Sequence, residues 1–175
     1  MKESEIHNII LIETRIKEKL SKVKYSQRFM HFNIYSPWLS KSKDIRLSYR
    51  RFLQLAWILK ESPSSLLLEK TSQNEIEKFL VVCDSNEKII KFIKVSKAFM
   101  KALFIEKKLK KTTLLENIYD ERLEISRKTI TRVLEKDGYL EFSLRTFLII
   151  LEGLKIDYDD FFKKIFEVIY NGTNN

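Results

Sequence analysis

Apolar residues recur every three or four positions along most of the chain, as they do on the buried face of an α-helix. Many of these stretches follow a serine, threonine or aspartate, the residues that cap helix N-termini. Together the two signals predict helices over residues 5–23, 27–33, 37–42, 49–60, 63–68, 73–83, 86–110 and 114–122, and three more that begin after Ser126, Ser143 and Asp157, the last reaching Tyr170. Glycine (3) and proline (2) are scarce, which disfavours the many turns of an all-β fold. The pattern therefore predicts an all-α protein.

Two of the helix starts carry a more specific signal. Ser72 with Glu75, and Thr113 with Glu116, have the spacing of a capping box. In that motif each side chain accepts a hydrogen bond from the backbone N–H of the other residue. Both starts are therefore predicted to be well defined.

An internal repeat appears when the chain is shifted by 95 residues. The segment Ser48–Leu67 then aligns with Ser143–Phe162, and six of the twenty positions are identical. The identities include residues outside the apolar pattern, namely the serine caps, an arginine in the first turn and a lysine at the helix end. We therefore predict two copies of one five-helix unit, over residues 5–70 and 96–170. The corresponding domains are residues 1–71 and 96–175, joined by a linker helix region at 72–95.

Each copy resembles the Xre-type (lambda-repressor-like) helix-turn-helix family. The resemblance rests on a serine that opens the recognition helix, a serine that opens a leucine-rich fourth helix, and a short fifth helix with a capped start. It is carried in the second copy by Ser126, Ile130, Ser143, Phe147, Ile150, Leu154, Asp157 and Phe161, and in the first by Ser26, Gln27, Ser36, Ser48, Phe52, Leu55, Ala56, Leu59, Ser62 and Leu66. It implies two five-helix units that bind duplex DNA, usually as a repressor or a regulator of mobile elements.

The two copies depart from the family pattern in different ways. The first keeps Ser26-Gln27 at the start of its second helix, where the glutamine of family members typically meets a phosphate. The second has Leu115-Glu116 there, and a carboxylate would repel phosphate. The stretch between the recognition helix and the fourth helix is also short in one copy and long in the other. Which copy contacts DNA is therefore left open.

The helix after Ser126 offers the clearest candidates for reading bases. At about 100° per residue, Lys128, Thr131 and Arg132 face outward with Glu135, Arg127 lies at the edge, and Thr129, Ile130 and Val133 face the core. Arginine can bind guanine through two hydrogen bonds, and lysine and threonine suit guanine or phosphate. The first copy offers Trp38, Ser40 and Lys41 in the same role. A solvated basic helix face is the alternative interpretation.

Other polar residues are candidates for phosphate contacts, which position a protein on DNA without reading its sequence. They gather at predicted helix starts and ends: Ser26, Gln27, Arg28, Ser36, Lys43, Arg46, Arg50, Arg51, Ser126 and Arg145. Arg50 and Arg145 occupy equivalent positions in the two copies, in the first turn of the fourth helix. Family members meet the DNA backbone at that turn.

Charge and composition bear on the partner. The net charge is +9, distributed as +7 over residues 1–70, +4 over 71–110 and −2 over 111–175. A basic chain is drawn to polyanions, but the clearest motif lies in its acidic third. One arrangement has both units reading adjacent half-sites, and another has one unit binding DNA while the other forms a homodimer.

Enzymatic chemistry finds little support in the sequence. There is one cysteine, Cys83, in an apolar run, and two histidines, His7 and His31, without metal-ligand spacing. No glycine-rich phosphate loop occurs, so we expect neither a metal nor a cofactor. No run of 18 apolar residues occurs, and an unpaired cysteine fits a reducing cytoplasm.

The alternative function is a protein-binding module on the same repeated scaffold. Mobile elements use such scaffolds to inhibit host defence nucleases or to hold a partner regulator. Residues 116–141 carry several acids and could imitate DNA toward a basic nucleic-acid-binding protein. A regulator that represses its own promoter could combine both roles.

Overall fold

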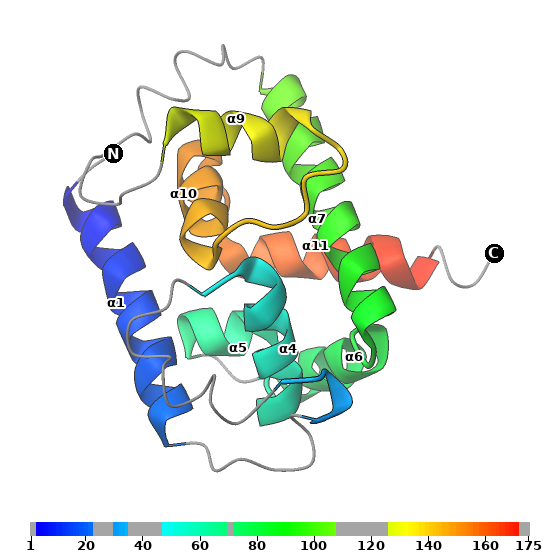
Figure 1. Cartoon of the computed structure of the whole chain (residues 1–175). Coiled ribbons are helices and arrows are strands. Elements are labelled where there is room, and N and C mark those ends of the chain that lie inside the picture. Colours follow the sequence, from blue (N-terminus) through cyan, green and yellow to red (C-terminus); the bar gives the residue numbers. More distant parts are fainter. Residues whose placement is uncertain (1–2, 23–29, 35–46, 70–71, 108–125, 172–175) are drawn as a thin grey trace.

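The computed structural model describes residues 3–22, 30–34, 47–69, 72–107 and 126–171 (Figure 1). Its helices are α1 (Glu3–Ser21), α4 (Tyr49–Leu59), α5 (Pro63–Leu68), α6 (Gln73–Val82), α7 (Asn86–Glu106), α9 (Arg127–Glu135), α10 (Leu144–Leu154) and α11 (Tyr158–Asn171). Within these ranges the chain is helical with no strand, which confirms the prediction of an all-α fold. The helices predicted at 37–42 and 114–122, and most of the one at 27–33, lie outside the described residues.

Serine caps begin the helices where the sequence predicts them. In α4, α5, α6, α7, α9 and α10 the hydroxyl of the preceding serine accepts the N–H of the residue three positions on, at 3.0–3.5 Å. Asp157 caps α11 in a similar way, because its Oδ1 accepts the N–H of Asp159 at 2.8 Å and that of Asp160 at 3.3 Å. Each cap satisfies a donor that has no partner inside its own helix. Local chemistry therefore sets these boundaries.

The repeat is visible in the ends of α4 and α10. Both helices have 11 residues. Both end at a lysine in the left-handed region, Lys60 with φ 58° and Lys155 with φ 52°. The N–H groups of these lysines bond to equivalent carbonyls, those of Ala56 and Trp57 in α4 and of Leu151 and Glu152 in α10. The copies diverge afterwards, because α5 has 6 residues and α11 has 14.

The two copies meet through a backbone bridge at their equivalent serines, Ser48 and Ser143. The N–H of Tyr49 donates to the carbonyl of Phe142 at 2.8 Å, and the N–H of Leu144 donates to the carbonyl of Leu47 at 2.7 Å. Each copy thus gives one donor and one acceptor from matching positions. The bridge sets the starts of α4 and α10 side by side in the interior.

The hydrophobic core is one cluster that draws residues from both copies. Helix α1 packs against α10 as well as α5, and α11 packs against α5, α6 and α7 (Figure 1). The cluster includes residues on both sides of the predicted boundaries at residues 71 and 95. These boundaries come from the sequence repeat, and the division into domains stays a prediction. The lambda-repressor-like arrangement of five helices per copy depends partly on segments outside the described residues, and it too stays a prediction.

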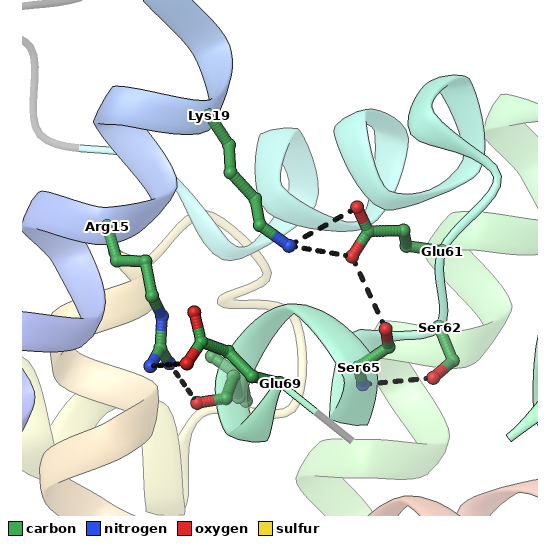
Figure 2. Close-up of polar contacts among 7 residues, drawn as sticks. Arg15, Lys19, Glu61, Ser62, Ser65 and Glu69 are labelled. Atoms are coloured by element: carbon green, nitrogen blue, oxygen red, sulfur yellow. Dashed lines mark hydrogen bonds and ion pairs between the residues drawn. The ribbon is translucent and has the colours of Figure 1, made fainter. Parts of the chain in front are cut away.

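Polar contacts attach α1 to the first copy (Figure 2). Arg15 pairs with Glu69 at 3.3 Å and also donates to a backbone carbonyl of α5. Lys19 donates to both carboxylate oxygens of Glu61, at 3.1 and 3.3 Å. Glu61 in turn accepts the hydroxyl of Ser65 at 3.3 Å. These contacts fix the position of α1 along α5.

Glu75 forms only half of the predicted capping box. Its N–H donates to Ser72, but its carboxylate turns inward, where Oε2 accepts the hydroxyl of Ser62 at 3.5 Å. The other oxygen, Oε1, is buried and has no hydrogen-bond partner among the described residues. Burial, and next the nearby carboxylate of Asp159 on α11, raise the pKa of Glu75.

Replacing Glu75 with glutamine should stabilise the protein at neutral pH. A carboxyl whose folded pKa is raised contributes stability below its unfolded pKa and loses it as pH rises through the folded pKa. At pH 7 the charged form is therefore the unfavourable one. Glu75→Gln removes that charge and can donate to Asp159, with an expected gain on the order of 1 kcal/mol. Urea unfolding at pH 7 and pH 4 measures the effect, and a gain that is equal at both pH values would contradict this account.

Candidate nucleic-acid interface

Helix α9 presents an apolar face to the core and a polar face to solvent. Ile130 and Val133 are each 1% exposed and Leu134 is 6% exposed. They pack toward α7 and α10, which lie beneath α9 in Figure 1. The other face carries Arg127 and Lys128, both exposed, and Thr131 and Arg132, both half-buried. The structure thus brings the four predicted base-reading residues of the second copy onto one face.

Two details of α9 differ from the prediction. Thr129 belongs to the helix start rather than the core face, because its hydroxyl bonds to that of Ser126 at 2.9 Å. Leu134 joins the buried face, which makes the apolar stripe wider than expected. Ser126 is itself occupied as the cap, since it also accepts the N–H of Thr129.

Two cations on the outer face of α9 have no counter-charge among the described residues. The side chains of Lys128 and Arg132 make no hydrogen bond or ion pair in the described part of the chain. Arg127 does have an interaction partner. Lys128 also stands in the first turn, where the helix dipole is positive and a cation is unfavourable. An anion close to Lys128 would offset this unfavourable position of its charge.

Lys97 of α7 holds the chain where it leaves α9. This side chain is 7% exposed, and its ammonium donates to the carbonyls of Lys136 at 2.6 Å, Tyr139 at 2.7 Å and Asp137 at 3.4 Å. Burial lowers the pKa of Lys97, an effect that Asp137 opposes and Lys101 reinforces. Three carbonyls around one ammonium fix the C-terminal end of α9 against α7.

A groove of about 430 Å³ lies beside that end of α9. Its α7 side is formed by Lys94, Lys97, Ala98 and Lys101, and its other side by Val133, Leu134, Asp137 and Gly138. Sequence reasoning did not single out the α7 lysines. Their spacing along one helix face was the available signal. Lys97 stands three residues after Lys94 and four before Lys101, so its spacing does not distinguish it from these neighbours, and only its burial does.

Arg50 and Arg51, predicted to bind phosphate, lie in a polar cluster that joins α4 to α7. Arg50 donates to Glu141 at 3.5 Å and to Asn86 at 3.4 Å. Arg51 donates to the side chain of Gln54 at 2.8 Å, and burial followed by the neighbouring charge of Arg50 lowers its pKa. Both arginines therefore have partners inside the protein.

Arg145, at the start of α10, pairs with a residue of α1. Its guanidinium forms an ion pair with Glu13, and the two side chains are only 19% and 9% exposed. An arginine committed to a buried carboxylate has little left to offer a phosphate. The equivalence of Arg50 and Arg145 in the sequence thus does not extend to their contacts.

The remaining predicted residues belong to the first copy and lie outside the described residues. They are the base-reading candidates Trp38, Ser40 and Lys41 and the phosphate candidates Ser26, Gln27, Arg28, Ser36, Lys43 and Arg46.

The described residues show no clear nucleophilic or metal-binding site. Cys83 is fully buried, and burial raises its pKa well above the usual value, which makes it a poor nucleophile. His31 stacks on Trp57 with ring centroids 4.8 Å apart. No group of three or more His, Cys, Asp or Glu in these ranges could hold a metal ion. No helix there has the length and apolar character to cross a membrane.

Comparisons of the chain with models of protein families, with curated proteins and with solved structures found no match. The candidate interface therefore rests on its own residues.

Replacing Lys97 with methionine should loosen the attachment of α9. Methionine keeps the apolar length but leaves the carbonyls of residues 136, 137 and 139 without their donor. We expect a loss of about 2–3 kcal/mol in the free energy of unfolding, measured by urea titration. Lys94→Met is the matched control, because Lys94 is exposed and has no partner in the described residues. Equal stability of the two variants would show that the ammonium bonds contribute nothing.

Proposed function

We propose that this chain is a sequence-specific regulator that binds double-stranded DNA, with α9 as the helix that enters the major groove. The observation that carries the proposal is the two-sided character of α9. One face is locked into the core, and the other presents Lys128, Thr131 and Arg132 together, with Lys128 and Arg132 unpartnered in the described residues.

The dimensions of α9 suit this role. Its nine residues span about 14 Å along the helix axis, and a helix of about 10–12 Å diameter fits the major groove of B-DNA. The face offers arginine for bidentate contact with guanine, and lysine and threonine for base edges or phosphates. Because α9 is held at its C-terminal end by Lys97, the side chains would be presented from a fixed position.

A tandem reader is the second part of the proposal. It is supported by the matched caps and left-handed ends of α4 and α10 and by the symmetric bridge at Ser48 and Ser143. Two related units in one chain could contact adjacent half-sites, as a repressor dimer does with two subunits. The first-copy helix at 37–42 that we equate with α9 lies outside the described residues.

The DNA-mimic alternative is less well supported by the described part of the acidic segment. A mimic needs a continuous negative face, as duplex DNA has one charge per roughly 1.7 Å of axis. In residues 126–141 the three acids, Glu135, Asp137 and Glu141, are outnumbered by four basic residues. Two of these acids have cationic partners, Asp137 with Lys101 at 3.2 Å and Glu141 with Arg50 at 3.5 Å.

Replacing Arg132 with alanine should relax sequence choice. The wild-type protein first selects its preferred duplex from a random pool, and fluorescence anisotropy then measures affinity for that duplex and for a shuffled one. Removal of a bidentate base contact should weaken binding to the selected duplex by roughly 1–3 kcal/mol. The affinity for the shuffled duplex should change much less. Lys164→Ala is the control, since it removes a cation on α11 that is already paired with Glu167 at 3.0 Å.

Two outcomes would overturn the proposal. One is that no sequence is enriched and selected and shuffled duplexes bind equally at low salt. The other is that Arg132→Ala and Lys164→Ala behave alike on every duplex, which would mean that the face of α9 reads no base.

A further inference from the structure

A row of lysines runs along the outer face of α7 beside α9. Lys91, Lys94 and Lys101 fall within about 80° of one another around the helix, and about 15 Å separates the first from the last along its axis. Lys91 and Lys94 are exposed, and Lys101 is half-buried. Lys94 and Lys101 line the groove at the end of α9, whereas Lys91, in the second turn of α7, lines a separate pocket with residues of α6 and α11 such as Val82 and Tyr170.

The lysines of this row are not needed to hold the fold together. Lys91 and Lys94 make no hydrogen bond or ion pair in the described part of the chain. Among the described residues Lys101 pairs only with Asp137, whose side chain is 89% exposed, and such solvent-exposed pairs contribute little to stability. Lys97, by contrast, is buried and its ammonium donates to three carbonyls. Its role is therefore structural, unlike that of Lys91, Lys94 and Lys101.

The charge of this face is positive but not uniform. Glu87 lies on the same face near the start of α7, and Asp137 faces the groove from the segment after α9. These two negative charges are outnumbered by the three lysines of the row and by Lys136, which is exposed next to the groove. A mobile ammonium on a flexible stem suits a phosphate oxygen as a point charge. Asp137 is already paired, and an incoming phosphate would compete with it for Lys101.

We infer that Lys91, Lys94 and Lys101 form a second contact surface, on which α7 binds backbone phosphates of the same duplex that receives α9; this rests on the proposed function of α9. The length of the row matches about four phosphates on one strand, at an axial spacing of about 3.4 Å. The surface positions the duplex and carries no sequence information. It supplies phosphate contacts at the end of α9 opposite to Lys128, so that the duplex is held at both ends of the helix.

The test compares two triple variants that each remove three positive charges. The first is Lys91→Gln, Lys94→Gln and Lys101→Gln. The control is Lys78→Gln, Lys163→Gln and Lys164→Gln, on α6 and α11. Binding of the selected and the shuffled duplex is measured over a range of salt concentrations. The first variant should reduce the slope of log K against log salt by roughly 0.9 for each phosphate that is no longer neutralised, about 2.7 in all, and weaken both duplexes alike. The control should keep most of the wild-type slope.

Lysine footprinting gives a measurement that does not depend on the variants. The bound duplex should protect Lys91 and Lys94 of the wild-type protein from acetylation, while Lys163 and Lys164 stay reactive. Circular dichroism and thermal unfolding check that each variant is folded. If the triple variant does not fold, Lys91→Gln and Lys94→Gln are measured singly, each with an expected slope change of about 0.9.

The outcomes separate this inference from the proposed function. If the wild-type protein shows sequence choice but both triple variants have the same salt slope, the α7 surface is overturned and the role of α9 stands. The inference is also overturned if the triple variant at Lys91, Lys94 and Lys101 weakens binding of single-stranded RNA as much as binding of the duplex. The row would then be a general surface for polyanions. If the wild-type protein binds no duplex at low salt, the proposed function fails, and this inference fails with it.

Discussion

The fold depends on the backbone bridge between Leu47–Tyr49 and Phe142–Leu144. The N–H groups of Tyr49 and Leu144 open helices α4 and α10, and such first-turn donors have no partner within their own helix. Both residues are fully buried, so water cannot satisfy those donors. Each copy instead satisfies the donor of the other, and leaving either group unpaired would cost about 1–3 kcal/mol. The rings of Tyr49 and Phe147, one from each copy, stack with their centroids 4.2 Å apart. Apolar packing thus holds the starts of α4 and α10 together in addition to the backbone hydrogen bonds.

The same bridge determines where α9 can lie. The segment after α9 enters the bridge at Phe142, only seven residues beyond the last residue of the helix. Lys97 holds the first part of that segment through three carbonyls, and Tyr49 bonds to Ser96, the neighbour of Lys97, at 3.3 Å. Helix α9 is therefore connected to the centre of the core by a short chain that is fixed at both ends. A rigid platform of this kind is what recognition of base edges requires.

Local features of this fold could be predicted from the sequence, while features that depend on long-range packing could not. Serine caps and apolar spacing place α4, α7 and α10 within a few residues, because both act over a single helical turn. The pairing of Glu13 with Arg145 joins residues 132 positions apart, and neither residue has a local signal for it. Lys97 has the same type and spacing as its exposed neighbours, so its burial is decided only by the arrival of the segment after α9. The outward polar face of α9, which we propose reads bases, was predictable because one helical period defines it.

Three of the described helices carry a cation at their second position, and the partners of these cations differ. These cations are Arg50 in α4, Arg145 in α10 and Lys128 in α9. At each start the helix dipole disfavours the charge. In α4 and α10 a carboxylate from a distant segment compensates, Glu141 for Arg50 and Glu13 for Arg145. Lys128 has no such partner in the described residues, although Glu135 and Glu141 belong to neighbouring segments. The fold neutralises the cation where α4 and α10 begin, whereas no described carboxylate does so for Lys128, which agrees with the proposal that α9 receives an anion from outside the protein.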